Sequence, residues 1–337
     1  MTGGGWLRRA RAVALGGLFA IAIGTSMSCP HRQLNAIAVV PKGTTHEFWK
    51  SVHAGAKRAG EELRVQILWK GPLREDDREQ QIQAVETFAD MNVIGIALAP
   101  LDSKALVPAA RDVASRHIPL VVFDSDLASD DKISYVATDN LHGGQLAGQY
   151  LGQLLTGQAN ARVAMLRYQE GSDSTNQREQ GFLDAIAAFP NIKVVSSNQY
   201  GGATTESAFK ASENLLAAQA TAAGATLQGI FCPNESTAFG MLRALEDNRL
   251  AGKVRFIGFD SSDKLVEALR QGHMDATVVQ DPMRMGYLAV KTIVDHLRGG
   301  VVKKRVDTGA TLVRREDLDD PKMKELLFPD YKKWLKE

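Results

Sequence analysis

Short apolar runs rich in valine and isoleucine recur along the chain and alternate with stretches of helical periodicity. Such runs are typical of strands in a parallel sheet that helices cover on both faces. In open α/β sheets, ligands bind at the carboxyl ends of the strands, so we expect a cleft built from distant segments. Six of the apolar runs end in clusters of polar or aromatic side chains, within residues 36–49, 118–126, 161–179, 227–235, 254–262 and 276–282.

The alternation of strands and helices restarts once, after Thr138-Asp139-Asn140. Before this point strands are expected near 35–41, 64–69, 92–98, 118–123 and 133–137. After it they are expected near 161–167, 192–196, 228–232, 254–259 and 275–280. Two such sets predict an α/β protein with two similar lobes, each a doubly wound parallel sheet with helices on both faces.

The N-terminus has the layout of a signal peptide, predicted over residues 1–28. An uncharged segment, 12–28, follows three arginines and is too short and glycine-rich for a typical membrane span. It ends at Ser26-Met27-Ser28-Cys29, which resembles a bacterial lipoprotein box with serine where leucine is usual. We therefore predict a lipid anchor on Cys29 and a place in the periplasm or cell envelope. Cleavage by an ordinary signal peptidase, or a free thiol at Cys29, remains the alternative.

The charge balance gives no electrostatic reason to expect that the protein binds nucleic acid. The whole chain has 40 lysines and arginines against 39 aspartates and glutamates. Removing the leader leaves 37 basic and 39 acidic residues, a net charge of −2. With Cys29 lipidated, Cys232 would stand alone, so no intrachain disulfide is expected. We expect a monomer whose contact with the membrane, if any, is the lipid anchor.

Motifs of catalysis are incomplete, so neither an enzyme nor a metal or cofactor is expected. Residues 46–50 read His-Glu-Phe-Trp-Lys, a zincin motif with lysine in place of the second histidine. Residues 124–126, Asp-Ser-Asp, lack the later oxygens and glycine of an EF-hand loop. No phosphate loop or nucleophile elbow occurs. His46 is expected to face solvent, and a hydrogen bond in a loop or in the cleft is the alternative.

A series of short motifs spans residues 35–313 and resembles the type I periplasmic sugar-binding proteins of the ribose-binding kind. Those proteins are the receptor components of ABC importers. The resemblance implies a three-segment hinge, with crossings near residues 138–139, 280–281 and 307–308, and a ligand between the lobes. The motifs are Phe48-Trp49, Phe123-Asp124, Asp139-Asn140 with Gly143-Gly144, Arg178-Glu179 with Gly181-Phe182, Asn234-Glu235, Gly258-Phe259-Asp260 and Gln280.

The crossings divide the chain into an N-terminal lobe and a C-terminal lobe, each made of two segments. The N-terminal lobe is predicted at 34–139 and 281–307, and the C-terminal lobe at 140–280 and 308–320. Residues 321–337 form a C-terminal extension, which we expect to pack on one lobe as an amphipathic element. Binding of a partner protein is the alternative role for this extension.

The candidate ligand residues supply the groups that recognise a sugar. Carboxylates accept hydroxyl protons, amides pair with donors and acceptors, arginine offers a rigid fork, and aromatic rings cover C–H faces. Asp124 and Asp260 could instead cap helices, and Arg178 could be a surface ion-pair residue. The two aromatic residues could be core, and the two amides could line the cleft without direct contact. The polar candidates are Asp124, Arg178, Asn234, Asp260 and Gln280, and the aromatic candidates are Phe48 and Trp49.

Two positions depart from the ribose-binding pattern. Ser125 stands where ribose binders carry arginine, and Lys42 adds a cation that could compensate. Pro41-Lys42, residues 124–126 and Pro233 also resemble relatives that bind autoinducer-2, a small furanosyl diol.

The function predicted is capture of a monosaccharide or related polyol and its delivery to the membrane permease of an ABC importer. The alternatives are binding of an autoinducer-2-like furanosyl ligand and a sensory role for a membrane kinase. A transcription-factor effector domain shares the fold but needs an N-terminal helix-turn-helix, where this chain has a signal segment.

Overall fold

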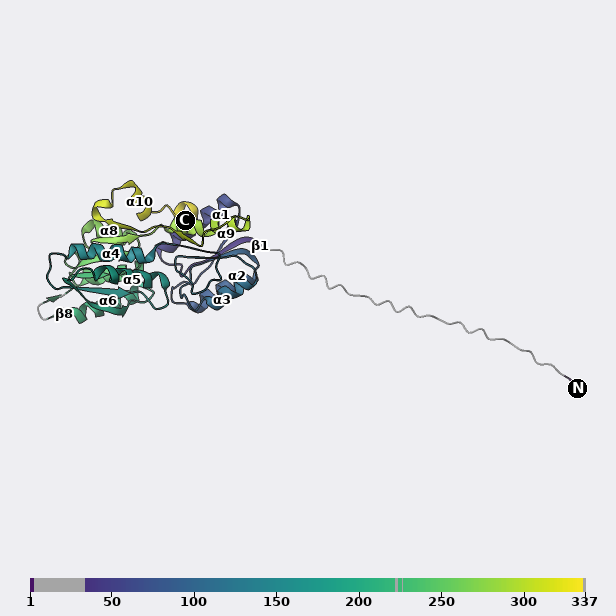
Figure 1. Cartoon of the computed structure of the whole chain (residues 1–337), viewed down its shortest axis with the longest axis horizontal. Coiled ribbons are helices and arrows are strands. Elements are labelled where there is room, and N and C mark those ends of the chain that lie inside the picture. The colour runs from purple at the N-terminus through teal and green to yellow at the C-terminus, as the bar shows by residue number, and fades with distance from the viewer. Residues whose placement is uncertain (3–33, 222–223, 226, 336–337) are drawn as a thin grey trace. The chain divides into compact units, whose positions relative to one another are not determined.

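The computed structural model describes residues 1–2, 34–221, 224–225 and 227–335, and those from residue 34 on belong to one compact unit. Most of the predicted leader and Cys29 lie outside the described residues. Two six-stranded sheets form the framework of the compact unit (Figure 1). A two-stranded ribbon, β8 (Ala220–Thr221) with β9 (Gly224–Ala225), is the third sheet among the described residues.

The first sheet has the strand order β13-β5-β4-β3-β1-β2, and every pairing is parallel. Helices α2 (Arg78–Asp90) and α3 (Val107–Ser115) cover one face, while α1 (Glu47–Leu63) and α9 (Pro282–Leu297) cover the other. Apolar side chains of alternate strand residues enter the two clusters, as expected for a sheet buried on both faces. The strands are β1 (Leu34–Val40), β2 (Gln66–Trp69), β3 (Val93–Leu98), β4 (Leu120–Phe123), β5 (Ser134–Ala137) and β13 (Arg305–Asp307).

The second sheet has the order β14-β12-β11-β10-β6-β7, parallel except for the edge pair of β12 and β14. Its helices again cover both faces: α4 (Asn140–Leu154) and α5 (Asp173–Ile186) on one, and α6 (Thr205–Gln219), α7 (Glu235–Asp247) and α8 (Asp263–Gln271) on the other. The strands are β6 (Ala161–Arg167), β7 (Ile192–Tyr200), β10 (Gly229–Phe231), β11 (Arg255–Phe259), β12 (Ala276–Val279) and β14 (Thr311–Arg314).

The predicted fold class is confirmed, with two similar α/β lobes built on the two sheets. We call them the first lobe and the second lobe. The chain crosses between them after β5, after β12 and after β13. Two crossings contact each other, since the hydroxyl groups of Thr138 and Thr308 lie 3.3 Å apart and the backbone N–H of Asp139 donates to Asp307.

Glycines allow the close helix pairing that positions part of the site. A Cβ atom on Gly144 of α4 would lie 2.0 Å from the carbonyl oxygen of Arg178 in α5. A Cβ on Gly181 would lie 2.1 Å from the carbonyl oxygen of Leu141. Only glycine permits this backbone approach, which holds the start of α5 against α4.

The C-terminal extension contacts both lobes, so the prediction that it packs on one lobe is wrong. After the short 3₁₀ helix at Arg315–Asp317, Leu327 of the extension is buried in the apolar cluster of α7 and α8. The last of its described helices, α11 (Lys332–Leu335), packs against α1 of the first lobe. The preceding helix is α10 (Pro321–Leu327), visible beside α8 in Figure 1. The extension therefore buries Leu327 in the second lobe, and its helix α11 contacts the surface of the first lobe.

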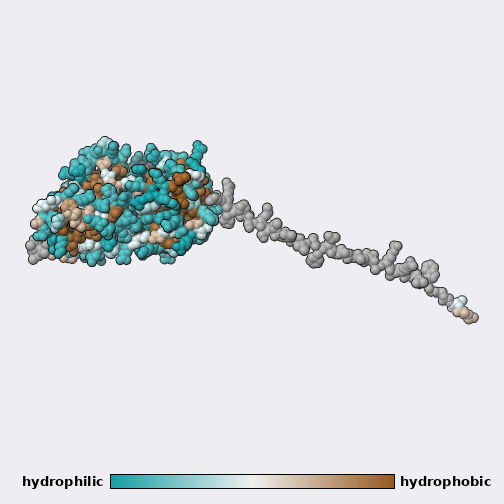
Figure 2. All heavy atoms as spheres, in the orientation of Figure 1, coloured by the Kyte–Doolittle hydropathy of each residue, from teal (hydrophilic) through white to brown (hydrophobic). Residues whose placement is uncertain are grey.

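Hydrophilic residues cover most of the face seen in Figure 2, and apolar residues show between them as small patches. Among the described helices, none combines the length and apolar character that a membrane crossing requires.

Candidate functional site

Asp124 and Asp260 occupy equivalent places in the two lobes. Each follows a phenylalanine that ends a central strand, β4 or β11, and each has a left-handed backbone, with φ of 61° and 69°. Such a conformation is uncommon for a residue other than glycine and is often found at functional sites. The N-cap of α8 is Ser262, and the element after Asp124 is β5, so capping does not explain either aspartate.

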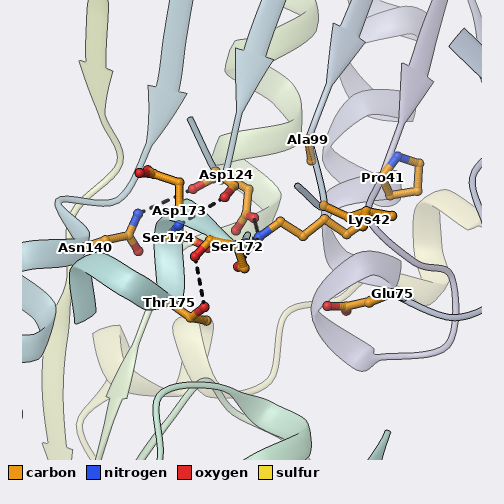
Figure 3. A network of polar contacts seen from close by, with 12 residues as sticks. Pro41, Lys42, Glu75, Ala99, Asp124, Asn140, Ser172, Asp173, Ser174 and Thr175 are labelled. Carbon is orange, nitrogen blue, oxygen red and sulfur yellow. Dashed lines mark hydrogen bonds and ion pairs between the residues drawn. The ribbon is translucent and has the colours of Figure 1, made fainter. Parts of the chain in front are cut away.

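Lys42 forms the centre of a polar network that joins the lobes (Figure 3). Its Nζ lies 2.8 Å from Oδ2 of Asp124 and donates to the hydroxyl groups of Ser174, at 2.9 Å, and Ser172, at 3.3 Å. Lys42 comes from the loop after β1, whereas the serines stand at the start of α5. The lysine therefore compensates a carboxylate of its own lobe and contacts the other lobe.

Ser125 is completely buried and also joins the lobes. Its hydroxyl oxygen accepts a hydrogen bond of 3.0 Å from the backbone N–H of Ser174. Next to it, the backbone N–H of Asp126 donates to Asp173 at 3.3 Å. The start of α5 thus occupies the space that a longer side chain at position 125 would need.

Arg178 is a buried residue of the site, so the alternative of a surface ion pair is wrong. Its Nε donates to Oδ1 of Asn140 at 2.8 Å, and its Nη1 donates to the carbonyl oxygen of Pro233 at 3.0 Å. The guanidinium carbon lies 3.9 Å from the centre of the Phe259 ring, and Nη1 lies 4.0 Å from Oδ2 of Asp260. Three segments of the second lobe and its hinge thereby fix the arginine fork.

Gln280 donates a hydrogen bond to Asp260, and the oxygen of its side-chain amide is left without a donor among the described residues. Its Nε2 donates to Oδ1 of Asp260 at 2.6 Å, while the backbone N–H of Glu235 donates to Oδ2 at 3.0 Å. Burial raises the pKa of Asp260, against the opposing effect of Arg178. Oε1 of Gln280 is buried and has no hydrogen-bond partner among the described residues. A buried acceptor without a donor is costly unless a ligand or water supplies one.

Asn234 uses its side chain within its own helix. Its Oδ1 accepts from the backbone N–H and the hydroxyl group of Thr237, at 3.3 and 2.6 Å, and its Nδ2 donates to Ser236 at 3.1 Å. Asn234 is thus the N-cap of α7. The geometry supports the alternative of a residue that lines the site.

The two aromatic residues differ in their surroundings. Trp49 is 2% exposed and packs in the core against Phe123, with ring centres 6.4 Å apart. Phe48 is 9% exposed and meets the Trp49 ring edge to face at 4.9 Å. The Trp49 side chain is therefore mainly a core residue, and Phe48 remains the stronger candidate for covering a sugar face.

Glu75 is a site residue that sequence reasoning missed. Its Oε1 accepts from Nε1 of Trp49 at 2.6 Å and lies 2.7 Å from Nδ1 of His46, while its Oε2 accepts from the hydroxyl group of Tyr168. Burial would raise the pKa of Glu75, but the charge and hydrogen bond of His46 outweigh it and lower that pKa to about 2.

His46 is mostly buried, so the expectation that it faces solvent is wrong. Its contact with Glu75 agrees with the alternative of a hydrogen bond in the cleft. Burial alone would lower its pKa, but the neighbouring Glu75 raises the pKa of His46 to about 9. Glu75 and Tyr168 lie 93 positions apart, so no local pattern could have paired them.

Glu235 connects the second lobe to the first. Its carboxylate oxygens accept from the backbone N–H groups of Glu47 and Phe48, at 3.4 Å each, at the start of α1. A helix N-terminus favours negative charge. Burial nevertheless dominates and raises the pKa of Glu235 to about 7, with His46 opposing that shift. Its place beside Asn234 in a recognised motif was the one signal that could have identified it.

A cavity of about 30 Å³ brings the candidates together. Eight of the nine predicted ligand residues line it, and Ser125 lies outside the lining. The volume is enough for a water molecule but not for a sugar ring. The predicted residues in its lining are Lys42, Phe48, Trp49, Asp124, Arg178, Asn234, Asp260 and Gln280, and the others are His46, Glu75, Ser174, Thr175 and Glu235.

The polar side chains that line the site are hydrogen-bonding groups. Within the part of the chain that the structure describes, no group of three or more histidine, cysteine or acidic side chains is arranged to hold a metal ion. Cys232 is buried in the core of the second lobe, where burial raises the pKa of its thiol well above the usual value. The thiol is therefore not a reactive group of the site.

Comparison with known proteins relates the chain to sugar-binding transport components. The family model described as "Periplasmic binding protein domain" matches residues 37–300. The chain is 28% identical to a ribose import binding protein of Haemophilus influenzae over 290 residues, which cover 85% of this chain and 94% of that protein.

Solved structures agree with this relationship. A solute-binding protein from Agrobacterium vitis with bound D-fucose is 34% identical and gives a TM-score of 0.82, over 87% of this chain and 100% of that one. A carbohydrate transporter solute-binding protein from Agrobacterium radiobacter, in complex with D-arabinose, is 32% identical with a TM-score of 0.82, over 87% and 99% of the two chains.

Proposed function

The chain belongs to the periplasmic binding protein family, and we propose that it captures a monosaccharide or related polyol between its lobes and delivers it to an ABC importer. It is a binding component of transport and not an enzyme. Its relatives place it in the periplasm. The partner implied is the membrane permease of the importer.

One observation carries this proposal. Two aspartates with the same strained backbone end equivalent strands of the two lobes, and the cavity between them also holds the Arg178 fork and the unpartnered Oε1 of Gln280. Carboxylates, an arginine fork and a free acceptor match the hydroxyl groups around a sugar. A few charge-assisted hydrogen bonds, at about 1.5–3 kcal/mol each, suffice for micromolar affinity after the costs of binding.

The relatives support a ligand class. Proteins similar to this chain are named for ribose, D-allose, D-arabinose and D-fucose. We therefore infer an aldose with five or six carbons. Lys42 and Ser125 distinguish the site from the ribose-binding pattern, so the preferred aldose differs from D-ribose in at least one hydroxyl position.

The lobe limits are part of the proposal. We assign 34–139 and 281–307 to the first lobe, 140–280 and 308–320 to the second, and 321–337 to the extension. The three crossings between the sheets support this division.

A thermal-shift screen tests the proposal, followed by calorimetric titration of each hit. The protein is the chain from residue 30 on, which contains the whole compact unit. The panel is D-ribose, D-allose, D-arabinose and D-fucose, with polyols and furanosyl diols. We expect at least one aldose to bind with a dissociation constant near 1 μM or below, about −8 kcal/mol. Failure of every sugar and polyol would refute the proposal.

We also propose that a lipid on Cys29 anchors the protein, on the strength of the sequence at the end of the leader. Replacing Cys29→Ser should move the protein from the membrane fraction to the soluble fraction without changing its affinity for the sugar. Cys232→Ala is the matched control, since its buried thiol cannot carry an anchor. Wild-type protein found only in the soluble fraction would rule out the anchor.

A further inference from the structure

A second cavity, of about 670 Å³, lies beside the small cavity of the sugar site. The starts of α1, α6 and α8 and the C-terminal extension contribute to its walls. Five residues line both cavities, so the two spaces are neighbours: His46, Phe48, Glu235, Asp260 and Gln280. We call the larger space the side chamber.

The C-terminal extension forms one wall of the side chamber and is tied to both lobes. The carbonyl oxygen of Leu327 accepts a hydrogen bond of 2.9 Å from the hydroxyl group of Ser261, in the loop after β11. At the other lobe, a hydrogen bond with Glu47 raises the pKa of Tyr331. The wall is built from Leu326, Leu327, Phe328, Pro329, Tyr331 and Lys332.

The lining of the side chamber suits a sugar ring or an aromatic group. Phe239, Phe328 and Tyr331 offer aromatic surface, and Thr205 and Ser261 offer hydroxyl groups. Aromatic faces with a few polar groups are the usual lining of small-molecule sites, whose volumes run from roughly 300 to 1,000 Å³. The volume of the side chamber lies within that range, whereas the small cavity lies far below it.

Gln280 stands at the junction of the two cavities. It is 4% exposed, and its Oε1 has no hydrogen-bond partner among the described residues. A hydroxyl group of a ligand that extends from one cavity into the other can donate to this oxygen. The free acceptor is therefore available to a ligand that occupies both cavities.

We propose that the side chamber is a second subsite, which receives a glycosidic substituent of the sugar bound between Asp124 and Asp260. The preferred ligand is then a glycoside or disaccharide, and the free monosaccharide binds with lower affinity because it leaves the side chamber empty. This inference rests on the proposed function, because it takes the sugar site as the first subsite. It also gives the C-terminal extension a role in specificity.

The test compares free sugars with their glycosides by calorimetric titration. D-ribose, D-allose, D-arabinose and D-fucose are each measured as the free sugar and as the phenyl α- and β-glycosides. We expect one glycoside to bind roughly tenfold or more tightly than its parent sugar, because an aromatic ring adds buried apolar contact.

Thr205→Trp fills the side chamber without touching the sugar site. Thr205 lines the side chamber but takes no part in the capping box of α6, which pairs Thr204 with Ser207. This variant should lose the gain from the glycoside, roughly tenfold, and keep the affinity for the free sugar. Tyr331→Ala, which opens the wall, should lose part of the same gain. The matched control is Thr87→Trp on the exposed surface of α2, which should behave as wild type.

The outcomes distinguish a failure of the second subsite from a failure of the proposed function. If free sugars bind and no glycoside binds more tightly than its parent sugar, the second subsite is wrong and the proposed function stands. If a glycoside binds more tightly but Thr205→Trp keeps the full gain, the substituent lies elsewhere and the inference is also wrong. If no sugar, polyol or glycoside binds, in this test or in the screen, the proposed function and the second subsite are both overturned.

Discussion

Nζ of Lys42 lies 2.8 Å from Oδ2 of Asp124, and both side chains are only 4% exposed. The pair stands at the carboxyl edge of the first sheet, and its lysine reaches two serines of the second lobe. A buried carboxylate needs a partner, because desolvation of an unpaired charge is very costly. The lysine supplies that partner where Ser125 replaces the arginine of the ribose-binding pattern.

We expect Lys42→Ala to destabilise the protein by about 3–5 kcal/mol, since it leaves the Asp124 carboxylate buried without a cation. Denaturant unfolding measures the change. Lys291→Ala is the control, because its ion pair with Asp295 is about 40% exposed and should contribute no more than about 1 kcal/mol. Equal effects of the two substitutions would contradict the importance of the buried pair.

Replacing Asp260→Ala should weaken sugar binding by about 2–4 kcal/mol, because sugar hydroxyls lose a charged acceptor in a closed site. Asp319→Ala, at an almost fully exposed aspartate, is the control. Calorimetric titration with the sugar found in the screen gives both values. Unchanged affinity in Asp260→Ala would remove this residue from the site.

The ion pair of His46 and Glu75 should make stability depend on pH. The folded protein raises the pKa of His46 from 6.5 to about 9, so the stabilisation is complete below pH 6.5 and is lost as the pH rises through 9. The loss should be on the order of 3 kcal/mol, at about 1.4 kcal/mol per pKa unit. Unfolding of His46→Gln between pH 6 and 10 should lack this decline. A decline of equal size in the variant would assign it to another group.

The carboxylate of Glu235 should make stability fall as the pH rises, whereas the usual carboxylate of a folded protein makes stability rise with pH. Its pKa is raised to about 7 in the folded protein, so it binds a proton that the unfolded chain has released. Stability from this group is therefore highest below pH 4.5 and falls as the pH rises through 7. Glu235→Gln should raise the melting temperature relative to wild type at pH 8 and change it less at pH 5. No difference at pH 8 would show that the carboxylate is not desolvated in solution.

Sugar binding should close the two lobes about their hinge. The 30 Å³ cavity cannot admit a sugar, so the lobes must separate for entry, and a ligand that contacts both lobes favours the closed state. Small-angle scattering should give a smaller radius of gyration with sugar than without it. Tyr168→Phe, which removes the hydrogen bond to Glu75 across the lobes, should shift the sugar-free protein further toward the open state. Identical profiles with and without a bound sugar would argue against the hinge.

Most strands could be predicted from the sequence, including the edge strands β2 and β7, but the short edge strands β13 and β14 could not. Predicted strands at 118–123 and 161–167 correspond to β4 and β6, because a strand buried on both faces is apolar along its length. β13 and β14 have three and four residues and are largely polar or half-buried. They are strands because β5 and β12 of their own sheets pair with their backbones, and the sequence has no local signal for pairing between segments so far apart in the chain.

The sequence by itself determined the fold class and the polar residues that follow the strands, because each depends on local periodicity or on a short motif. Only the tertiary structure decided how those residues are used. It places Asn234 in a helix cap and Trp49 in the core, and it pairs the Lys42 ammonium with the Asp124 carboxylate. It also brings Glu75 to Tyr168 and the C-terminal extension to α1. These pairings depend on distances between segments far apart in the chain, which are set by the packing of whole lobes.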